Sequence, residues 1–288
     1  MRFLNPTTDY AFKKIFGSAE SGDILLSFLN AILGFASPYR LASVQIQDPY
    51  LAPRIKGMKD SFVDVRATDE QGKQYVIEMQ ILPVTSFEQR ILFNACKAYA
   101  GQIAKGEDYR LLNDVIALTI TDFVMFDQHP DIVSKFKLRD ESGREYSDDL
   151  ELIFVELPKF VKLENQLGDM FDKWCYFLRH ATSLRDIPPV LAQEQAIDHA
   201  FSIANRAQLS PEELELQERR EIYLQDQRGA QEYAMKKGHS EGRAEGLAEG
   251  EAMASQKIAK NMKALGMPDQ QIAALTGLSL EEISRLPD

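Results

Sequence analysis

The sequence is poor in cysteine, has no long apolar run and carries no excess of positive charge. Its two cysteines, Cys96 and Cys175, lie in apolar, helix-like contexts, and no spacing of cysteine and histidine resembles a zinc site. We therefore expect buried thiols in a reducing compartment rather than a disulfide framework. No apolar stretch approaches the length of a membrane span, and the first residues lack the pattern of a signal peptide, so a cytoplasmic protein without a membrane partner is expected.

The formal net charge of −11 is unfavourable for nucleic-acid binding, because phosphate contacts normally accompany a basic surface. Part of the acidic excess lies between Pro211 and Glu251, so the value for the whole chain overstates the charge of the remainder. The sequence contains no glycine-rich phosphate loop of the Walker type, and we expect no nucleotide cofactor.

The most informative stretch is 61–81, which has the pattern of two short strands joined by a turn. In the first strand Asp64 and Arg66 would point to one face and Val63 and Val65 to the other, and Gly72 in the turn can adopt a positive φ. Folding the hairpin about this turn predicts three opposed pairs: Thr68 with Gln74, Arg66 with Val76, and Asp64 with Glu78.

Two carboxylates directly opposite each other repel, because opposed Cβ atoms in a hairpin are roughly 4.5–5.5 Å apart. Positive charge between Asp64 and Glu78 would remove the repulsion. A hard divalent cation with oxygen ligands, such as Mg²⁺, could supply that charge. A basic side chain, Arg66 or another, could do the same, and on the hairpin alone both acids could simply face solvent. The spacing leaves these alternatives open.

A strand ending in Asp and a second strand carrying Glu-x-Lys are the signature of the PD-(D/E)xK nuclease superfamily, and here Asp64 precedes Glu78-Met79-Gln80. The chain resembles the Rpn family of recombination-promoting nucleases, a transposase-like group in that superfamily. The resemblance extends from the start of the chain to about His180. The segments that carry it occur in the family's order: Thr7–Gly17, Ile77–Gln80, Arg90, Tyr99, Gly106–Tyr109 and Glu156–Phe160.

The resemblance implies an α/β (α+β) fold, with a restriction-endonuclease-like core in which helices flank a central mixed sheet, and with an extended helical C-terminal tail. It also implies a DNA endonuclease that hydrolyses phosphodiester bonds with Mg²⁺, or Mn²⁺ in its place. Asp64 and Glu78 would hold the metal. Gln80 stands where the superfamily has lysine. A glutamine can orient water by hydrogen bonds or complete the ligand shell, but it cannot act as a base or carry charge.

Further site residues follow from the same resemblance, each with an alternative. An extra acidic ligand often lies on the first helix of these nucleases, and Asp9 is the candidate metal ligand, with Glu20 as the second choice. Asp9 could instead be a first-turn helix charge. Arg90 could contact a phosphate, pin a carboxylate or be an exposed helix charge. Lys97 or Lys73 could replace the missing lysine.

Composition divides the chain into three parts: a nuclease-like domain at 1–207, a charged helical segment at 208–256 and a small helical hairpin at 257–288. The first domain begins with a helix capped by Thr7 or Thr8. Later in the same domain a polar surface insertion separates two buried strands, and a helix carries the sole tryptophan. These later elements are expected at 114–126 and 151–157 for the strands, 127–149 for the insertion, Asp169–Ala181 for the Trp174 helix and about 190–207 for the last helix.

The tail contains two patterns that each permit two interpretations. Four glycines recur at four-residue spacing, and each costs a helix about 1 kcal/mol relative to alanine. They are Gly238, Gly242, Gly246 and Gly250. They indicate either close packing against a helix of a second copy or a frayed spacer. At the end of the chain, the spacing of Ala273, Gly277 and Ile283 fits a helix-turn-helix, but acidic residues at the start of its second helix would repel phosphates, so a plain helical hairpin is favoured.

We therefore expect a metal-dependent DNA endonuclease that self-associates through its C-terminal helices. The alternative is a catalytically weak or inactive nuclease fold that acts as a nucleic-acid-binding or oligomerising scaffold, which the missing lysine and the acidic balance favour. A helix-turn-helix regulator is the third hypothesis.

Overall fold

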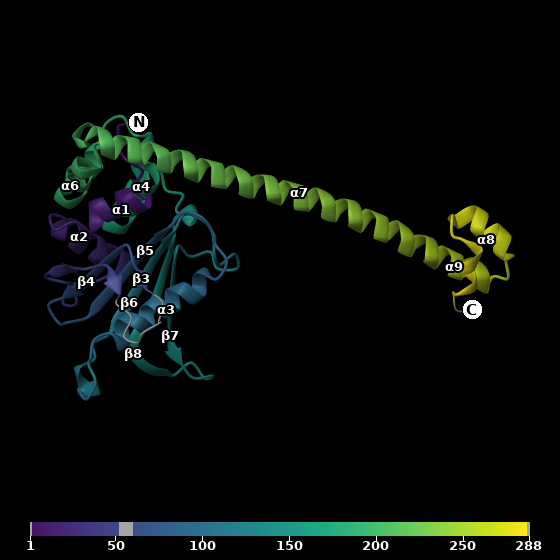
Figure 1. Ribbon diagram of the computed structural model, residues 1–288, viewed down its shortest axis with the longest axis horizontal. Helices are drawn as coiled ribbons and strands as arrows, with labels where there is room; N and C mark the ends of the chain where they lie inside the picture. Colours follow the sequence, from purple (N-terminus) through teal and green to yellow (C-terminus); the bar gives the residue numbers. More distant parts are fainter. Residues whose placement is uncertain (1, 52–59, 287–288) are drawn as a thin grey trace. The chain divides into compact units, whose positions relative to one another are not determined.

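The computed structural model describes residues 2–51 and 60–286. The chain divides into two compact units, Met1–Gln217 and Glu218–Asp288 (Figure 1). The first unit contains a mixed six-stranded sheet with the strand order β1-β4-β5-β6-β8-β7. The strands of this sheet are β1 (Val44–Gln47), β4 (Val65–Asp69), β5 (Gln74–Gln80), β6 (Val115–Thr121), β7 (Val133–Arg139) and β8 (Glu145–Glu156). β5, β6 and β8 are parallel, and the other pairs are antiparallel.

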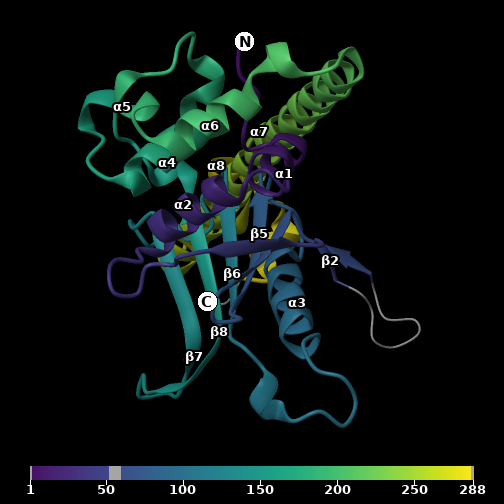
Figure 2. The ribbon, with the colours of Figure 1, turned by 90° about the vertical axis from the view of Figure 1, so that its left-hand side faces the viewer.

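Helices cover both faces of this sheet. They are α1 (Asp9–Phe16), α2 (Gly22–Leu33), α3 (Phe87–Ala100), α4 (Met170–His180), α5 (Pro189–Ala192) and α6 (Gln195–Ala204). A separate two-stranded ribbon pairs β2 (Tyr50–Leu51) with β3 (Ser61–Phe62). Short 3₁₀ turns lie at Tyr109–Leu111, Leu157–Lys159, Glu164–Gln166, Ala181–Ser183 and Arg206–Gln208. The arrangement is the mixed sheet flanked by helices that the sequence predicts (Figure 2).

The ends of α1 follow directly from the sequence. The Thr8 side chain accepts a hydrogen bond from the Ala11 N–H and caps the N-terminus, as expected for one of the two threonines. Gly17 ends the helix. Between these limits Phe12 and Phe16 are fully buried, so α1 is anchored in the core along one side.

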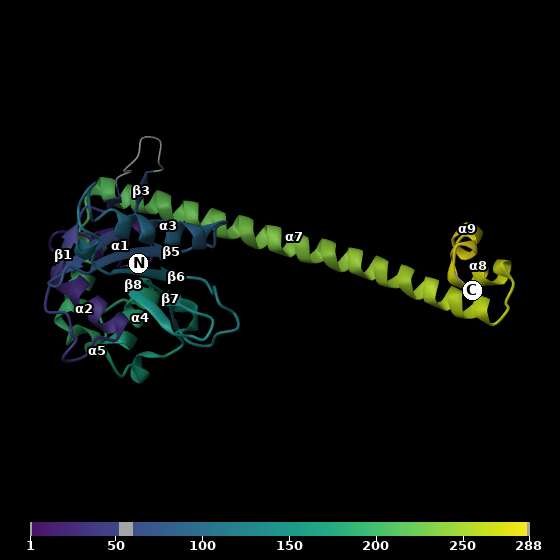
Figure 3. The same ribbon diagram turned by 90° about the horizontal axis from the view of Figure 1, so that it is seen from below.

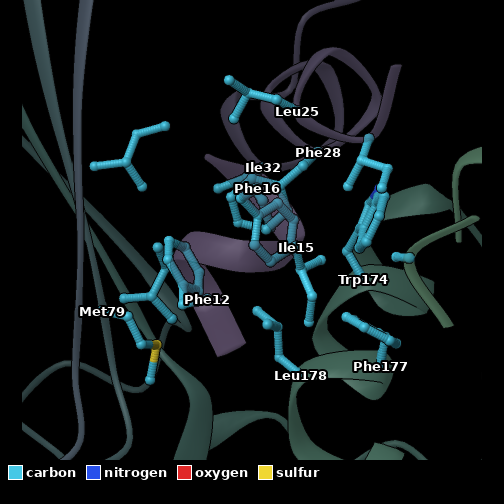
Figure 4. Packing of buried hydrophobic residues seen from close by; sticks show 14 of the residues in the cluster. Phe12, Ile15, Phe16, Leu25, Phe28, Ile32, Met79, Trp174, Phe177 and Leu178 are labelled. Atoms are coloured by element: carbon cyan, nitrogen blue, oxygen red, sulfur yellow. The ribbon is translucent and has the colours of Figure 1, made fainter. Parts of the chain in front are cut away.

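The larger core fills the space between one face of the sheet and α1, α2, α4 and α6. Trp174 on α4 is fully buried there, with its ring centre 5.7 Å from those of both Phe16 and Phe28. Met79 of β5 belongs to the same cluster, and Figure 4 shows it beside Phe12. This packing fixes α1 next to β5.

The other face of the sheet is covered by α3, which lies along β5 and β6 (Figure 3). Ile91 and Ala95 of α3 pack with Phe154 of β8 in a second apolar cluster. Because β5 and β6 are covered on both faces, every residue of β6 is buried, as its continuous apolar run predicts.

Three expectations about the elements and cysteines of the first unit are wrong. The polar surface insertion expected at 127–149 is part of the sheet, because it contains β7 and the start of β8; β7 pairs with one strand only, and most of it remains exposed, as is usual for an edge. The segment after Pro189 forms two helices, α5 and α6, instead of one. Cys96 is exposed, whereas Cys175 is buried as predicted.

The long helix α7 (Pro211–Ala264) begins with a capping box, in which the Ser210 N–H donates to Glu213 and the Glu213 N–H donates to the Ser210 hydroxyl. The helix continues through all four repeat glycines. Apart from the neighbouring residues and the nearby backbone of α7 itself, no atom of the described residues lies within 4 Å of the position a Cβ would occupy at any of these glycines.

The second unit ends in a small three-helix cluster. α8 (Asp269–Thr276) and α9 (Leu280–Ser284) pack against the end of α7 through three fully buried residues, Ala259, Ile272 and Ile283. The end of the chain therefore contains one more helical segment than the two expected. None of the helices described for residues 2–51 and 60–286 is both long and apolar enough to cross a membrane.

Candidate active site

Asp64 lies at a bend immediately before β4. The predicted hairpin register is present, with Arg66 opposite Val76 and Thr68 opposite Gln74. The ladder begins at Val65, however, so Asp64 is not a paired strand residue. Val63 packs on the α3 side of the sheet and Val65 on the opposite side. The expectation that both share a face is thus wrong, because the bend interrupts the alternation.

The bend brings the Asp64 carboxylate to the backbone of β5 and to the side of α1. Its Oδ2 accepts a hydrogen bond of 2.7 Å from the N–H of Met79, the residue after Glu78. Its Oδ1 lies 3.2 Å from the Nζ of Lys13. The same ammonium is 2.7 Å from Oδ1 of Asp9, one helical turn earlier. Lys13 therefore bridges two carboxylates, one from α1 and one from the hairpin.

Burial is the main reason why the pKa of Asp64 is raised, to about 7, and its hydrogen bond with Asp9 acts in the same direction. The Met79 N–H and the charge of Lys13 oppose this rise. For Lys13, burial alone would lower the pKa, but the hydrogen bond to Asp9 and the charge of Asp64 outweigh burial and raise it. Lys13 therefore stays protonated beside the two acids.

Glu78 is held by α3 on the other side of β5. Its side chain is 10% exposed, and its Oε1 accepts a 2.7 Å hydrogen bond from the Asn94 amide. The Ser61 hydroxyl donates to the Asn94 Oδ1 at 2.8 Å, which fixes the orientation of that amide. The Arg90 guanidinium lies 3.5 Å from the Glu78 Oε2. A polar chain from β3 to α3 thus positions this carboxylate.

Both ends of the Gln80 side chain amide are held by protein groups. Its Nε2 donates to the carbonyl of Leu82 at 2.8 Å, and its Oε1 accepts from Arg90 at 2.7 Å. Arg90 also lies over the Phe87 ring, with its guanidinium carbon 5.1 Å from the ring centre. Of the three roles considered for Arg90, its contacts in this structure are those of a residue that pins a carboxylate.

The structure places Asp9 and Asp64 around Lys13, and Glu78 and Gln80 around Arg90. The Met79 N–H that binds Asp64 belongs to the residue after Glu78, so β5 links the two groups. Glu20, the second candidate on the N-terminal side, is exposed in the turn after α1 and forms no hydrogen bond or ion pair with the described residues. Sequence reasoning missed Lys13 and Asn94. Each lies four residues after a residue that was identified, Asp9 and Arg90 respectively, and this helical spacing is the signal that could have found them.

The two lysines proposed as substitutes for the missing motif lysine lie in other surroundings. Lys73 forms an ion pair of 2.9 Å with Asp114 at the turn end of the hairpin, away from Asp64. Lys97 is buried, with its ammonium 5.8 Å from the centre of the Phe93 ring. Among the lysines that the structure describes, Lys13 is the one that pairs with Asp64.

The donor chemistry of the site fits a hard divalent cation, because Asp64 and Glu78 offer carboxylate oxygens of the kind that Mg²⁺ and Mn²⁺ bind. No group of three or more acidic, histidine or cysteine side chains in the described part of the chain is arranged to hold a metal ion. Lys13 and Arg90 provide the positive charge beside these carboxylates instead. Among the described residues, Asp64 and Glu78 are the carboxylates of this site that could bind such an ion.

Two models of known protein families match the chain. Residues 6–234 match the family described as PD-(D/E)XK nuclease family transposase, and residues 253–288 match the Rpn/YhgA-like nuclease family, C-terminal HTH domain. Because the first match covers most of the chain, the protein belongs to the PD-(D/E)XK nuclease family transposases. The resemblance to the Rpn family is thereby confirmed. No curated protein and no solved structure matches the chain.

The second match concerns the end of the chain, where the sequence favours a plain helical hairpin and leaves a helix-turn-helix as the alternative. The family description supports the alternative. In agreement with the spacing that suggested it, Gly277 takes a left-handed conformation with φ of 74° between α8 and α9, and Ile283 is fully buried. The acidic residues at the start of α9, Glu281 and Glu282, are exposed.

Proposed function

We propose that the protein is a metal-dependent DNA endonuclease in which Asp64 and Glu78 hold a divalent cation, Mg²⁺ or Mn²⁺. The observation that carries the proposal is the hydrogen bond from the Met79 N–H to Asp64, which holds this carboxylate against the strand that bears Glu78. The PD-(D/E)XK family supports the reaction class. Gln80 and Asp9 complete the site, and Arg90 holds Glu78 from α3.

The reaction is the hydrolysis of a phosphodiester bond. A water oxygen bonds to phosphorus, one ester P–O bond breaks, and the leaving oxygen takes a proton, which yields a hydroxyl end and a phosphomonoester end. A bound divalent cation supplies a Lewis acid that stabilises negative charge at the phosphate. The chain itself orients the two carboxylates, through the Met79 N–H for Asp64 and through Asn94 for Glu78.

The test is nicking of supercoiled plasmid by the full chain with Mg²⁺, with Mn²⁺ and with EDTA. Asp64→Ala and Glu78→Ala should each reduce nicking at least 100-fold, whereas Asp148→Ala, which changes an exposed carboxylate on β8, should leave it unchanged. Trp174 fluorescence verifies that each variant is folded. Nicking that persists in EDTA or in both active-site variants would reject the assignment.

A nuclease fold that acts as a scaffold is the second candidate, because both ends of the Gln80 amide are held by protein groups. On this hypothesis the folded wild-type protein binds DNA without metal-dependent nicking, and Asp64→Ala leaves DNA binding intact. Plasmid nicking and gel-shift measurements on the same preparations separate the two candidates.

We further propose that the C-terminal segment contributes to DNA binding through its helix-turn-helix and to self-association through α7. The helix-turn-helix family supports the first role, and the unoccupied space at the repeat glycines supports the second. Sedimentation of the full chain and of a Gly242→Leu variant tests self-association. A monomer at all concentrations would exclude it.

The free thiols are consistent with action in the cytoplasm.

A further inference from the structure

Lys13 occupies a position that the proposed chemistry can use. Its ammonium lies 2.7 Å from Asp9 and 3.2 Å from Asp64, and its side chain is 41% exposed. The group is therefore held by the protein and reachable from solvent at the same time. The backbone beneath it is fixed, because the neighbouring Phe12 and the nearby Phe16 are fully buried in the core (Figure 4).

An ion pair of this kind contributes little to stability. Asp9 and Lys13 are four residues apart on a helix surface and half-exposed, a geometry that typically contributes about 0.3–0.5 kcal/mol. The Asp64 carboxylate is already held by the Met79 N–H. The pair with Asp9 therefore gives only a weak reason for a lysine at this position.

The Glu78-Met79-Gln80 segment, by contrast, has no positive charge at the position where the superfamily pattern has lysine. Gln80 brings no charge, and both ends of its amide are held by Leu82 and Arg90. A phosphodiester that approaches Asp64 and Glu78 needs positive charge near its non-bridging oxygens, because two carboxylates would otherwise repel it.

We propose that Lys13 is the lysine of this site, delivered by α1 instead of β5, and that its ammonium binds a non-bridging oxygen of the scissile phosphate beside Asp64. The inference rests on the proposed nuclease function. Asp9 then acts as a positioning residue that orients Lys13, in place of the metal-ligand role considered for it.

The first test does not require catalysis. Binding of the full chain to a duplex oligonucleotide in EDTA is measured at several salt concentrations, since each phosphate contact contributes about 0.9 to the slope of log K against log salt. Lys13→Met should reduce the slope by about 0.9. Lys73→Met, which removes the same charge at the turn end of the hairpin, should leave it unchanged. An unaltered slope for Lys13→Met would overturn the proposal.

The second test is rescue of nicking. Lys13→Met should lower the nicking rate at least 100-fold, Lys13→Arg should retain more activity, and Lys13→Met/Gln80→Lys should recover at least tenfold by returning the ammonium to the motif position. A purely structural role for Lys13 predicts no rescue, and that result would refute the inference. If the wild-type protein does not nick DNA at all, the proposed function fails, and the salt slope still decides whether Lys13 binds phosphate.

The role of Asp9 is tested separately by Mn²⁺ binding, measured by calorimetry. Asp9→Asn should leave the Mn²⁺ affinity unchanged while slowing nicking, because it loosens Lys13 without removing a ligand. A tenfold or greater loss of Mn²⁺ affinity would identify Asp9 as a metal ligand and contradict its assignment as the residue that orients Lys13.

Discussion

The two compact units are stabilised by very different amounts of buried apolar surface. The unit Met1–Gln217 has an aromatic core that includes Phe16, Phe28 and Trp174, all fully buried. The unit Glu218–Asp288 has three fully buried apolar side chains among its described residues, and the repeat-glycine stretch of α7 is exposed. The first unit can hold charged groups in fixed positions because its core is rigid, whereas most of the second relies on local helix propensity.

The largest effect is expected in the core of the first unit. Phe16→Ala should lower its free energy of unfolding by about 3–5 kcal/mol, because the substitution removes a fully buried ring and leaves a cavity. Urea unfolding followed by fluorescence measures this directly, since the sole tryptophan, Trp174, lies in the same core. A wild-type unfolding midpoint in this variant would show that the core is not the main source of stability.

The corresponding substitution in the second unit is Ile272→Ala. The transfer and cavity cost is about 2–5 kcal/mol, enough to unfold a three-helix cluster this small. Amide exchange in α8 and α9 should become as fast as in an unfolded peptide, while the Trp174 transition stays unchanged. A shift of that transition would mean that the two units unfold together and would break the comparison.

The exposed helix between these cores should respond in the opposite direction. Gly242→Ala should stabilise α7 by about 1 kcal/mol, because alanine is the better helix former and the site is open. Circular dichroism during thermal unfolding measures the change in helix content. Gly277→Ala is the control: its φ of 74° is unfavourable for alanine, so this variant should lose stability.

The smallest effect concerns the start of α7, within the first unit. Glu213 pairs with Lys14 and Tyr10, and the side-chain hydrogen bond from Lys14 is the largest of the interactions that lower the pKa of Glu213 to about 2. Since the folded-state pKa lies below the ordinary value of 4.5, this pair stabilises above about pH 4.5 and its contribution is lost as the pH falls towards 2.

Glu213→Gln should therefore lower stability by about 0.2–1 kcal/mol at pH 7, because solvent screens this partly exposed pair. The difference between variant and wild-type urea midpoints should shrink towards zero between pH 4.5 and 2. A difference that grows on acidification would contradict the assigned direction.

Much of the fold could be predicted because the local signals agree with the tertiary structure. The continuous apolar run of β6 requires two covered faces, and helices occupy both. The caps Thr8 and Ser210 mark helix starts independently of anything distant. The strand β7 was missed although polar and apolar residues alternate from Lys135 to Arg139, because the polar, turn-rich sequence on either side of it favours a surface insertion.

The candidate site could be predicted only in part. Counting residues outward from the turn that contains Gly72 predicts which residues of β4 and β5 lie opposite each other, and the observed pairs agree from Val65 onwards. The same count places Asp64 beside β5. The bend before Val65 could not be foreseen, because the alternation of Val63, Asp64 and Val65 is that of a continuous strand, whereas the structure places Val63 on the α3 side. The contact between Lys13 and Asp64 could not be predicted either. It joins α1 to the hairpin, and neither segment alone indicates that the two meet.

The difference between the two cysteines has a practical consequence for spectroscopy. Cys175 is fully buried, and this burial raises the pKa of its thiol, whereas Cys96 is exposed on α3 between Asn94 and Lys97. A maleimide dye or spin label added at neutral pH should therefore attach at Cys96 alone, without any engineered substitution. The native chain thus offers a single attachment point on the helix that carries Arg90 and Asn94, from which distances to labelled DNA can be measured.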